Sequence, residues 1–206
     1  MHLKRWTTFG VIGLLVMALG AWNGMGVSQH TSHQSQDKQQ VVEEVDVTAP
    51  EINAEEKKEE VVELENAEGS VVATATLSKA DGGVHIDMEV SDLPPGTHGF
   101  HVHEKGVCEP PDFESAGEHY NPTNMKHGKL NPEGPHAGDF DNIEVDENGQ
   151  AHVDFTTNQV TLEKGQETTL YTDEGTSLVI HADPDDYKSQ PSGNAGERIA
   201  CGVIGE

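Results

Sequence analysis

Short segments that alternate apolar and polar residues fill the chain from about residue 60 onward, and turn residues separate them. The candidate strands are residues 61–67, 70–78, 84–90, 143–145, 151–155, 178–181 and 199–204, together with a strand around His101. Asp81, Gly82 and Gly83 form a typical hairpin turn, as does the pair Asn148 and Gly149. No segment has the apolar spacing of an amphipathic helix of useful length. The pattern therefore predicts an all-β domain, either a sandwich or a barrel.

The N-terminal residues carry a different pattern. Lys4 and Arg5 precede residues 9–21, which are apolar or glycine. A basic start before an apolar run shorter than the about 20 residues of a membrane span is typical of a secretory signal segment. Extended to residue 27, the run approaches spanning length. We therefore predict that residues 1–27 are a signal peptide or an N-terminal membrane anchor. The protein would be exported, and either secreted or tethered to the cell membrane.

Residues 28–59 contain no aromatic side chain and few large apolar ones. Such a segment buries too little apolar surface to offset the entropy lost on ordering. We predict an acidic disordered linker over residues 28–59 and one folded domain over residues 60–206. His30 and His33 lie in the linker, and we interpret them as solvated side chains.

The chain is strongly acidic. It has 12 lysines and arginines against 37 aspartates and glutamates, which gives a formal net charge of −25. A chain with this charge repels polyanions. Nucleic acid and anionic membrane surfaces are therefore excluded as partners of the mature protein.

Candidate metal ligands begin at two histidines in one strand. His101 and His103 alternate with Phe100 and Val102. Because successive side chains of a strand point to opposite faces, both imidazoles leave one face while the apolar pair enters a core. Two imidazoles on one face are close enough to share a single ion.

A second group of candidate ligands follows in a segment rich in glycine, proline and asparagine. His119, His127, His136 and Asp139 are spaced so that a loop can bring them around an ion. Three nitrogens and one oxygen make a closed tetrahedral set that suits zinc, whereas an all-imidazole set with an open position suits copper. The sequence therefore predicts a centre for two metal ions.

Six motifs resemble the copper/zinc superoxide dismutases, in the family's order and over roughly residues 60–206. The motifs are GFHVHE at 99–104, SAGEHYNP at 115–122, KHG at 126–128, GPHAGD at 134–139, LVIH at 178–181 and GNAGERIACGVIG at 193–205. The loop between Cys108 and His119 is similar to that of bacterial exported members. The resemblance implies an immunoglobulin-like Greek-key β-sandwich or flattened barrel with long metal-binding loops.

The resemblance also implies a role for each ligand. The copper ligands are His101, His103, His119 and His181, and the zinc ligands are His119, His127, His136 and Asp139. His119 is thus the imidazolate shared by both ions. None of these seven residues is missing from the chain.

Two further residues match the family's site. Asp185 resembles an aspartate that accepts hydrogen bonds from a copper ligand and a zinc ligand, here His101 and His127. Arg198 resembles the arginine that orients the substrate anion. His119 would deliver a proton to the second substrate molecule. His98 resembles a structural histidine of the family, and His85 and His152 are predicted to lie on the surface.

The implied activity is the conversion of superoxide to oxygen and hydrogen peroxide by alternate reduction and oxidation of copper, with a structural zinc. The alternative is a superoxide-dismutase-like protein that binds copper and zinc without turnover. The bacterial branch of the family includes monomers and homodimers, and both states remain open from the sequence.

The chain has two cysteines, Cys108 and Cys201. In an exported protein, an even count of two favours one disulfide bond, whereas two separate buried thiols are the alternative. A bond would fix Arg198, three residues before Cys201, relative to the copper.

The charge also bears on how an anion is captured. Most acidic residues lie on the linker or on loops remote in sequence from Arg198. We therefore expect local attraction by Arg198 and the copper site to outweigh the global repulsion. Turnover should then fall as ionic strength rises.

Overall fold

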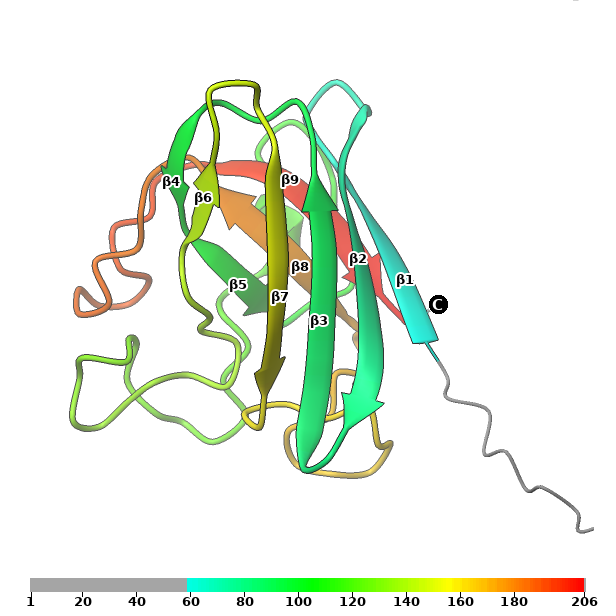
Figure 1. Ribbon diagram of the computed structural model, residues 1–206. Coiled ribbons are helices and arrows are strands. Elements are labelled where there is room, and N and C mark those ends of the chain that lie inside the picture. Colours follow the sequence, from blue (N-terminus) through cyan, green and yellow to red (C-terminus); the bar gives the residue numbers. More distant parts are fainter. Residues whose placement is uncertain (1–58, 206) are drawn as a thin grey trace, which may run out of the picture. The chain divides into compact units, whose positions relative to one another are not determined.

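The computed structural model describes residues 59–205. These residues form nine strands and one short 3-10 helix, η1 (Glu114–Ala116), shown in Figure 1. The strands are β1 (Glu59–Glu65), β2 (Val71–Ala80), β3 (Gly83–Val90), β4 (Gly96–His98), β5 (Phe100–His103), β6 (Ile143–Val145), β7 (Ala151–Thr157), β8 (Thr176–His181) and β9 (Arg198–Ile204). The prediction of an all-β domain is confirmed.

Seven of these strands form one antiparallel sheet in the order β5-β8-β9-β1-β2-β3-β7, and β4 pairs with β6 in a small second sheet. The large sheet curls, so that β1, β2, β3 and β7 make one wall while β5, β8 and β9 cross behind it (Figure 1). This is the expected flattened Greek-key barrel. Long loops connect β5 to β6 and β8 to β9, as the resemblance implied.

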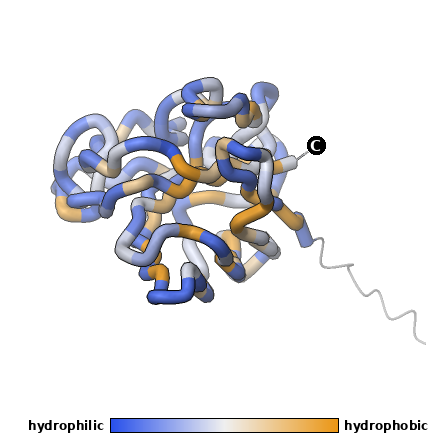
Figure 2. Tube along the Cα trace, turned by 90° about the horizontal axis from the view of Figure 1, so that it is seen from above, coloured by the Kyte–Doolittle hydropathy of each residue, from blue (hydrophilic) through white to orange (hydrophobic). Residues whose placement is uncertain are grey.

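The core lies between the two walls. Its fully buried side chains include Leu64, Leu77, Ile86, Phe100, Leu178 and Ile204. Hydrophobic positions recur along the trace between hydrophilic ones, as expected for strands with one face in a core (Figure 2). Burial of apolar surface on this scale is the main force that holds the sheet together.

The outer faces of the two walls differ. Along β7, partly buried residues such as Val153 and Phe155 alternate with the exposed His152 and Asp154. Along β8, all six residues are buried, so the outer face is covered as well. The cover includes Phe113 and Ala116 of the loop after β5, which pack with Val179 and the disulfide bond.

The strand bounds differ from the sequence prediction at several ends. β1 begins at Glu59 and ends at Glu65, because residues 66–70 close a turn in which the Asn66 side chain accepts the backbone N–H groups of Glu68 and Ser70. β8 begins at Thr176, two residues before the prediction. β4 was not predicted, because a three-residue strand after two prolines carries no alternation.

The predicted signal peptide or anchor and nearly all of the predicted linker lie outside the described residues. Within residues 59–205, no helix has both the length and the apolar character to span a bilayer.

Candidate metal centre

β5 positions the first two candidate ligands. Phe100 and Val102 of this strand enter the core, while His101 and His103 lie on the opposite face and are also buried. The loop after β5 docks on this face through backbone hydrogen bonds, since Val102 N donates to Gly138 O and Tyr120 N donates to Val102 O. This docking lays the long loop across the two imidazoles.

The structure brings the candidate ligands together in two groups. The ligand atoms in each group lie within 4.8 Å of one another, and all residues involved are buried. The first group is His101, His103, His119 and His181, and the second is His119, His127, His136 and Asp139. His119 belongs to both, which is the division of ligands that the sequence analysis expected.

The imidazoles of His103 and His181 are held so that one nitrogen of each faces the other. His103 Nδ1 donates to Gly117 O at 2.9 Å, and His181 Nδ1 donates to Gly196 O at 3.4 Å. With the proton on Nδ1, each Nε2 carries a lone pair, and the two Nε2 atoms lie 3.3 Å apart. Two acceptors that face each other this closely suit a bound cation.

Asp185 orients one histidine of each group. Its Oδ2 accepts His101 Nε2 and its Oδ1 accepts His127 Nε2, each at 3.0 Å. Both imidazoles therefore carry their proton on Nε2 and turn a free Nδ1 inward. This is the bridging position that the resemblance implied for Asp185.

The free nitrogens are the test of whether metal ions fit. The buried ring nitrogens without a hydrogen-bond partner are His101 Nδ1, His119 Nε2, His127 Nδ1 and His136 Nδ1. His127 Nδ1 lies 3.0 Å from Asp139 Oδ2 and His136 Nδ1 lies 3.3 Å from Asp139 Oδ1, in orientations that make no hydrogen bond. A buried lone pair without a partner is costly, and a metal ion satisfies it. The donor atoms therefore fit copper in the first group and zinc in the second.

The electrostatics of the first group favour neutral imidazoles. Burial lowers the pKa of His119 to about 4 and that of His181 to about 2. Burial also holds the pKa of His103 well below its ordinary value, and the neighbouring imidazoles add to this shift. Because a histidine must be deprotonated to bind a metal, these ligands are ready at neutral pH.

The second group combines positive and negative partners. Burial opposes charge on His127, but the Asp139 and Asp185 carboxylates outweigh it and raise the pKa of His127 to about 9, so zinc would displace a proton from Nδ1 when it binds at neutral pH. Although burial opposes their ionisation, hydrogen bonds from the histidines hold the pKa of Asp139 and Asp185 below the usual range. Both carboxylates are therefore ionised and available to a cation.

The loop after β8 is shaped closely around Asp185. Gly193 adopts a φ of 68°, and a Cβ at this position would collide with Asp185 Oδ1 and His127 Nε2. Only glycine combines this backbone conformation with the space that the carboxylate needs.

Three residues that support the centre were missed by the sequence analysis. Gln190 clamps the backbone of His127, because its Oε1 accepts His127 N and its Nε2 donates to His127 O, each at 3.0 Å. Asn142 does the same for the backbone of Asp185, and Gln159 Nε2 donates to His136 O at 3.0 Å. Amides in loops have no sequence pattern that marks such a clamp.

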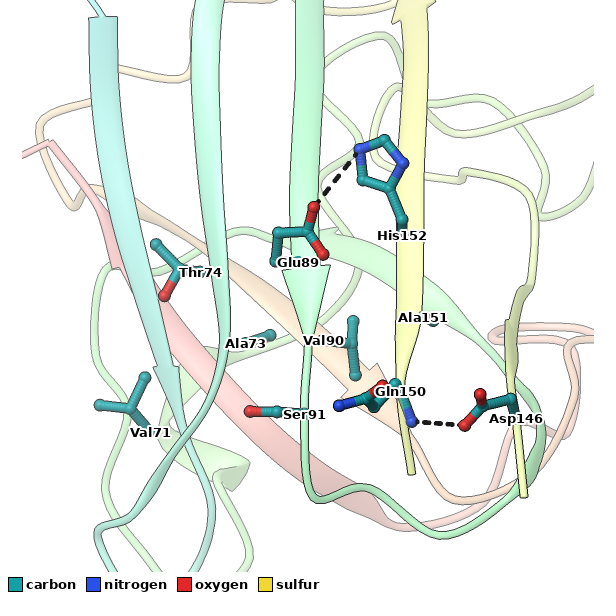
Figure 3. A pocket seen from close by; sticks show the side chains of 10 residues that line it. All are labelled: Val71, Ala73, Thr74, Glu89, Val90, Ser91, Asp146, Gln150, Ala151 and His152. Atoms are coloured by element: carbon teal, nitrogen blue, oxygen red, sulfur yellow. Dashed lines mark hydrogen bonds and ion pairs between the residues drawn. The ribbon is translucent and has the colours of Figure 1, made fainter. Parts of the chain in front are cut away.

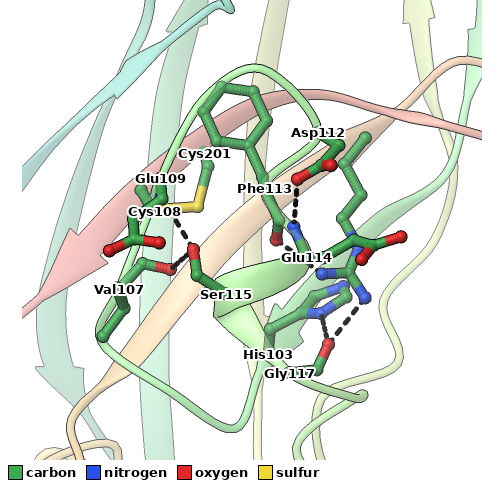
Figure 4. The surroundings of a disulfide bond; sticks show 11 residues. His103, Val107, Cys108, Glu109, Asp112, Phe113, Glu114, Ser115, Gly117 and Cys201 are labelled. Carbon is green, nitrogen blue, oxygen red and sulfur yellow. Dashed lines mark hydrogen bonds between the residues drawn. A yellow bond between two sulfur atoms is a disulfide. The ribbon is translucent and has the colours of Figure 1, made fainter.

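Cys108 and Cys201 form a disulfide bond, so the prediction of one bridge is confirmed. The bond packs with Phe113, whose carbonyl oxygen accepts Arg198 Nη1 at 2.5 Å. Figure 4 shows the loop from Val107 to Gly117 wrapped around the bond. The bond therefore fixes the position of the loop segment whose Phe113 carbonyl accepts the hydrogen bond from Arg198.

Gly117 connects the arginine to a candidate copper ligand. Its carbonyl oxygen accepts His103 Nδ1 at 2.9 Å and Arg198 Nη2 at 2.6 Å. One backbone carbonyl thus fixes both the tautomer of His103 and the place of the guanidinium group.

Three acidic residues that are remote from Arg198 in sequence act on it in the folded chain. Burial lowers the pKa of Arg198, and the carboxylates of Glu118, Glu114 and Asp112 act against this shift through their charge. All three carboxylates belong to exposed residues of the loop after β5. The docking of this loop brings them close to Arg198, although they are remote from it in sequence.

Within residues 59–205, the three remaining histidines lie where the sequence analysis expected them. His98 is buried, and its two ring nitrogens each lie 2.8 Å from a backbone carbonyl oxygen, of Pro94 and of His181. His85 and His152 lie on the outer face of β3 and β7, with side chains that are 34% and 54% exposed.

The fold and the site together define a class, an all-β protein with two histidine-rich metal sites that share one imidazole. The sequence profile of the copper/zinc superoxide dismutases matches residues 67–204. The Cu-Zn superoxide dismutase 2 of Aquifex aeolicus is 53% identical over 143 residues, which are 69% of this chain and 84% of that protein. The chain belongs to the copper/zinc superoxide dismutase family.

Solved structures agree with this membership. A SOD-like protein from Bacillus subtilis superposes with a TM-score of 0.68 at 41% identity, covering 70% of this chain and 97% of that one. The Cu/Zn superoxide dismutase from Brucella abortus superposes with a TM-score of 0.58 at 33% identity, covering 72% of this chain and all of the other.

Proposed function

We propose that this chain dismutates superoxide at its histidine centre, with copper held by His101, His103, His119 and His181. As a member of its family, the protein is an oxidoreductase that uses copper and zinc. The observation that carries the assignment of ligands is the set of buried ring nitrogens that have no hydrogen-bond partner. They come from residues in both groups, and His119 Nε2 faces the copper group.

Zinc is assigned to His119, His127, His136 and Asp139. Three nitrogens and one carboxylate oxygen complete a tetrahedral set without an open position, which is typical of structural zinc. Asp139 supports this role, because its carboxylate lies within 3.3 Å of a nitrogen of all three histidines.

Bound copper would supply the redox chemistry, in which one superoxide gives up an electron to become oxygen and a second takes up that electron and two protons, one of them from water, to become hydrogen peroxide. A nitrogen that binds a metal carries no proton, so His119 Nε2 would hold a proton only when it is not bound to copper, and would then deliver it to the second superoxide as general acid. Its Nδ1 lies 2.8 Å from Asp139 Oδ1, which fixes the ring in the orientation that transfer requires. Arg198 binds and orients the anion through charge-assisted hydrogen bonds.

The test of the ligand assignment is metal content together with turnover. The purified, metal-loaded chain should hold one copper and one zinc and dismutate superoxide. His103→Ala should lose copper and more than about a hundredfold of the activity while it keeps zinc, since even partners of a ligand contribute 10- to 100-fold to metal affinity. Asp139→Ala should weaken the binding of zinc before that of copper. Equal loss of both metals in both variants would contradict two distinct sites, and a fully loaded chain without turnover would identify a metal-binding protein instead.

The N-terminal assignments are a separate part of the proposal. Residues 1–27 act as a signal peptide or anchor, residues 28–59 as an acidic spacer, and the protein works outside the cytoplasm. The disulfide bond supports this location, because such bonds persist in oxidising compartments. A chain that begins at Glu59 should keep its turnover. Loss of most turnover in a folded truncated chain would assign the spacer to the site, and sedimentation of the full chain would distinguish a monomer from a homodimer.

A further inference from the structure

A third group of metal-ligating side chains lies outside the catalytic centre, on the outer face of β3 and β7. We propose that Asp87, Glu89 and His152 bind a divalent transition-metal ion of the zinc or copper(II) type. Their donor atoms all lie within 4.8 Å of one another. None of the three belongs to the two ligand groups of the catalytic centre.

The pairing of β3 and β7 brings these side chains together before any ion binds. Glu89 lies directly opposite His152 in the antiparallel register, and Asp87 is two residues from Glu89 and so lies on the same face. Figure 3 shows Glu89 and His152 pointing toward one another from the two strands. The strands hold the group in place, so an ion does not have to order a loop in order to bind.

The separations of the donor atoms are those of a metal site. His152 Nε2 lies 3.1 Å from Asp87 Oδ1, with which it makes a hydrogen bond that an ion would replace, and 3.7 Å from Glu89 Oε1. In a tetrahedral site with bonds of about 2.1 Å, two ligand atoms lie about 3.4 Å apart. The two measured distances bracket this value, so small rotations of exposed side chains complete the geometry.

The carboxylates around the group create a negative charge that a bound cation would offset. Asp87 lies directly opposite Asp154, and like charges in this position destabilise a sheet. On the other side, the β2 residues opposite Glu89 and Asp87 are Thr74 and Thr76, which bring no positive charge. A bound cation would offset the repulsion that the strand register creates.

The donor set selects the kind of ion. One imidazole nitrogen with two carboxylate oxygens suits zinc or copper(II), whereas calcium and magnesium prefer oxygen ligands alone. The three side chains are about half exposed or more, and a hollow of about 580 Å³ borders His152 and Glu89 (Figure 3). Water can therefore fill the remaining coordination positions, and the ion should exchange readily.

The experiment uses the full chain loaded with copper and zinc, so that the catalytic sites are already filled. Zinc sulfate is titrated calorimetrically into the wild type, His152→Ala, and the double variant Asp87→Asn/Glu89→Gln. His85→Ala is the matched control, because His85 lies on the same face with a single carboxylate, Asp154, at 3.4 Å. The N-terminal histidines are the same in all four proteins, so differences between them report on the surface group.

We expect the wild type and His85→Ala to bind one more zinc equivalent than His152→Ala and the double variant, or to bind it more than about tenfold more tightly. Copper(II) added in place of zinc should give a second electron paramagnetic resonance signal, beside that of the catalytic copper, with coupling to one nitrogen, and His152→Ala should lack it. Dismutase activity should be the same in all four proteins, which shows that each is folded. Equal zinc binding by wild type and His152→Ala would overturn the proposal. An equal loss of zinc binding in His85→Ala and His152→Ala would also overturn the proposal.

Discussion

The catalytic centre on β5 and β8 and the open group on β3 and β7 are built on the same principle and differ in what covers them. In both, histidines project from the outer face of paired antiparallel strands, and the carboxylates come from loops in the catalytic centre and from β3 in the open group. The β5 ligands His101 and His103 are almost completely buried, whereas the His152 side chain is 54% exposed. The difference comes from the loop after β5, which docks on its own strand, while nothing in the described part of the chain covers the outer face of β7 in this way.

The comparison shows what a loop adds to a pattern of ligands on a strand. The covering loop excludes water from the centre. Each buried ring nitrogen therefore needs a hydrogen-bond partner or a metal ion, and a specific carbonyl or carboxylate fixes each histidine tautomer. In the open group the side chains are exposed to solvent, and His152 Nε2 is within hydrogen-bond distance of Asp87 Oδ1. A buried site can therefore retain a metal during turnover, while an exposed site releases it.

The most direct test of this comparison is to loosen the loop that covers the β5 ligands. Reduction of the Cys108–Cys201 bond should lower the free energy of unfolding by about 4 to 5 kcal/mol in the chain-entropy account of a loop of this length. Activity should fall as well, because the bond holds the segment that anchors Arg198. Urea denaturation with and without reductant measures the effect. The Cys108→Ser/Cys201→Ser variant is the control, since reductant should leave it unchanged. Unaltered stability and turnover after complete reduction would contradict this role.

The next prediction concerns the carboxylate that links the two buried ligand groups. Asp185→Asn should weaken metal binding about 10- to 100-fold, because His101 and His127 lose the partner that fixes their tautomers. Competition with a chelator measures the affinity for each metal. Asp186→Asn is the matched control, since Asp186 is exposed and accepts hydrogen bonds only from its own turn and from Asn194. Similar affinities in the two variants would show that Asp185 does not orient the ligands.

A smaller effect is expected where the substrate meets the centre. Arg198→Ile should lower the rate about tenfold or more, the equivalent of about 1.5 kcal/mol for a lost charge-assisted hydrogen bond. Copper content should stay at the wild-type level, and Arg198→Lys should recover part of the rate. An isoleucine variant with the wild-type rate and full copper would exclude Arg198 from anion binding.

The smallest predicted effect comes from the acids near Arg198. Because Glu118, Glu114 and Asp112 act on the guanidinium group, we now expect screening to raise the rate as salt increases, in contrast to the expectation from sequence. Glu118→Gln should raise the rate at low ionic strength about twofold, the effect of one unit charge about 9 Å away in water. Glu63→Gln on the exposed face of β1 is the control. A rate that falls with salt in the wild type would restore the original expectation.

The residues that the structure gathers into two candidate ligand groups could be predicted from the sequence because their signals are local. His101 and His103 share a face by the two-residue period of a strand, and the motifs around His119, His127 and His136 keep a fixed spacing. Gln190 and Asn142 could not be predicted. Each clamps a backbone segment more than 40 positions away, and only the docking of two loops brings them into contact.

The sequence by itself determined that this chain is an all-β protein with seven candidate ligands for two metals and one pair of cysteines. The alternation of apolar and polar residues and the spacing of the histidines involve residues close together in the chain, so they can be recognised in the sequence alone. The tertiary structure decided which ring nitrogens are free, how the loop acids surround Arg198, and that Glu89 faces His152. These depend on strand register and loop docking, which bring distant residues together through backbone hydrogen bonds and burial.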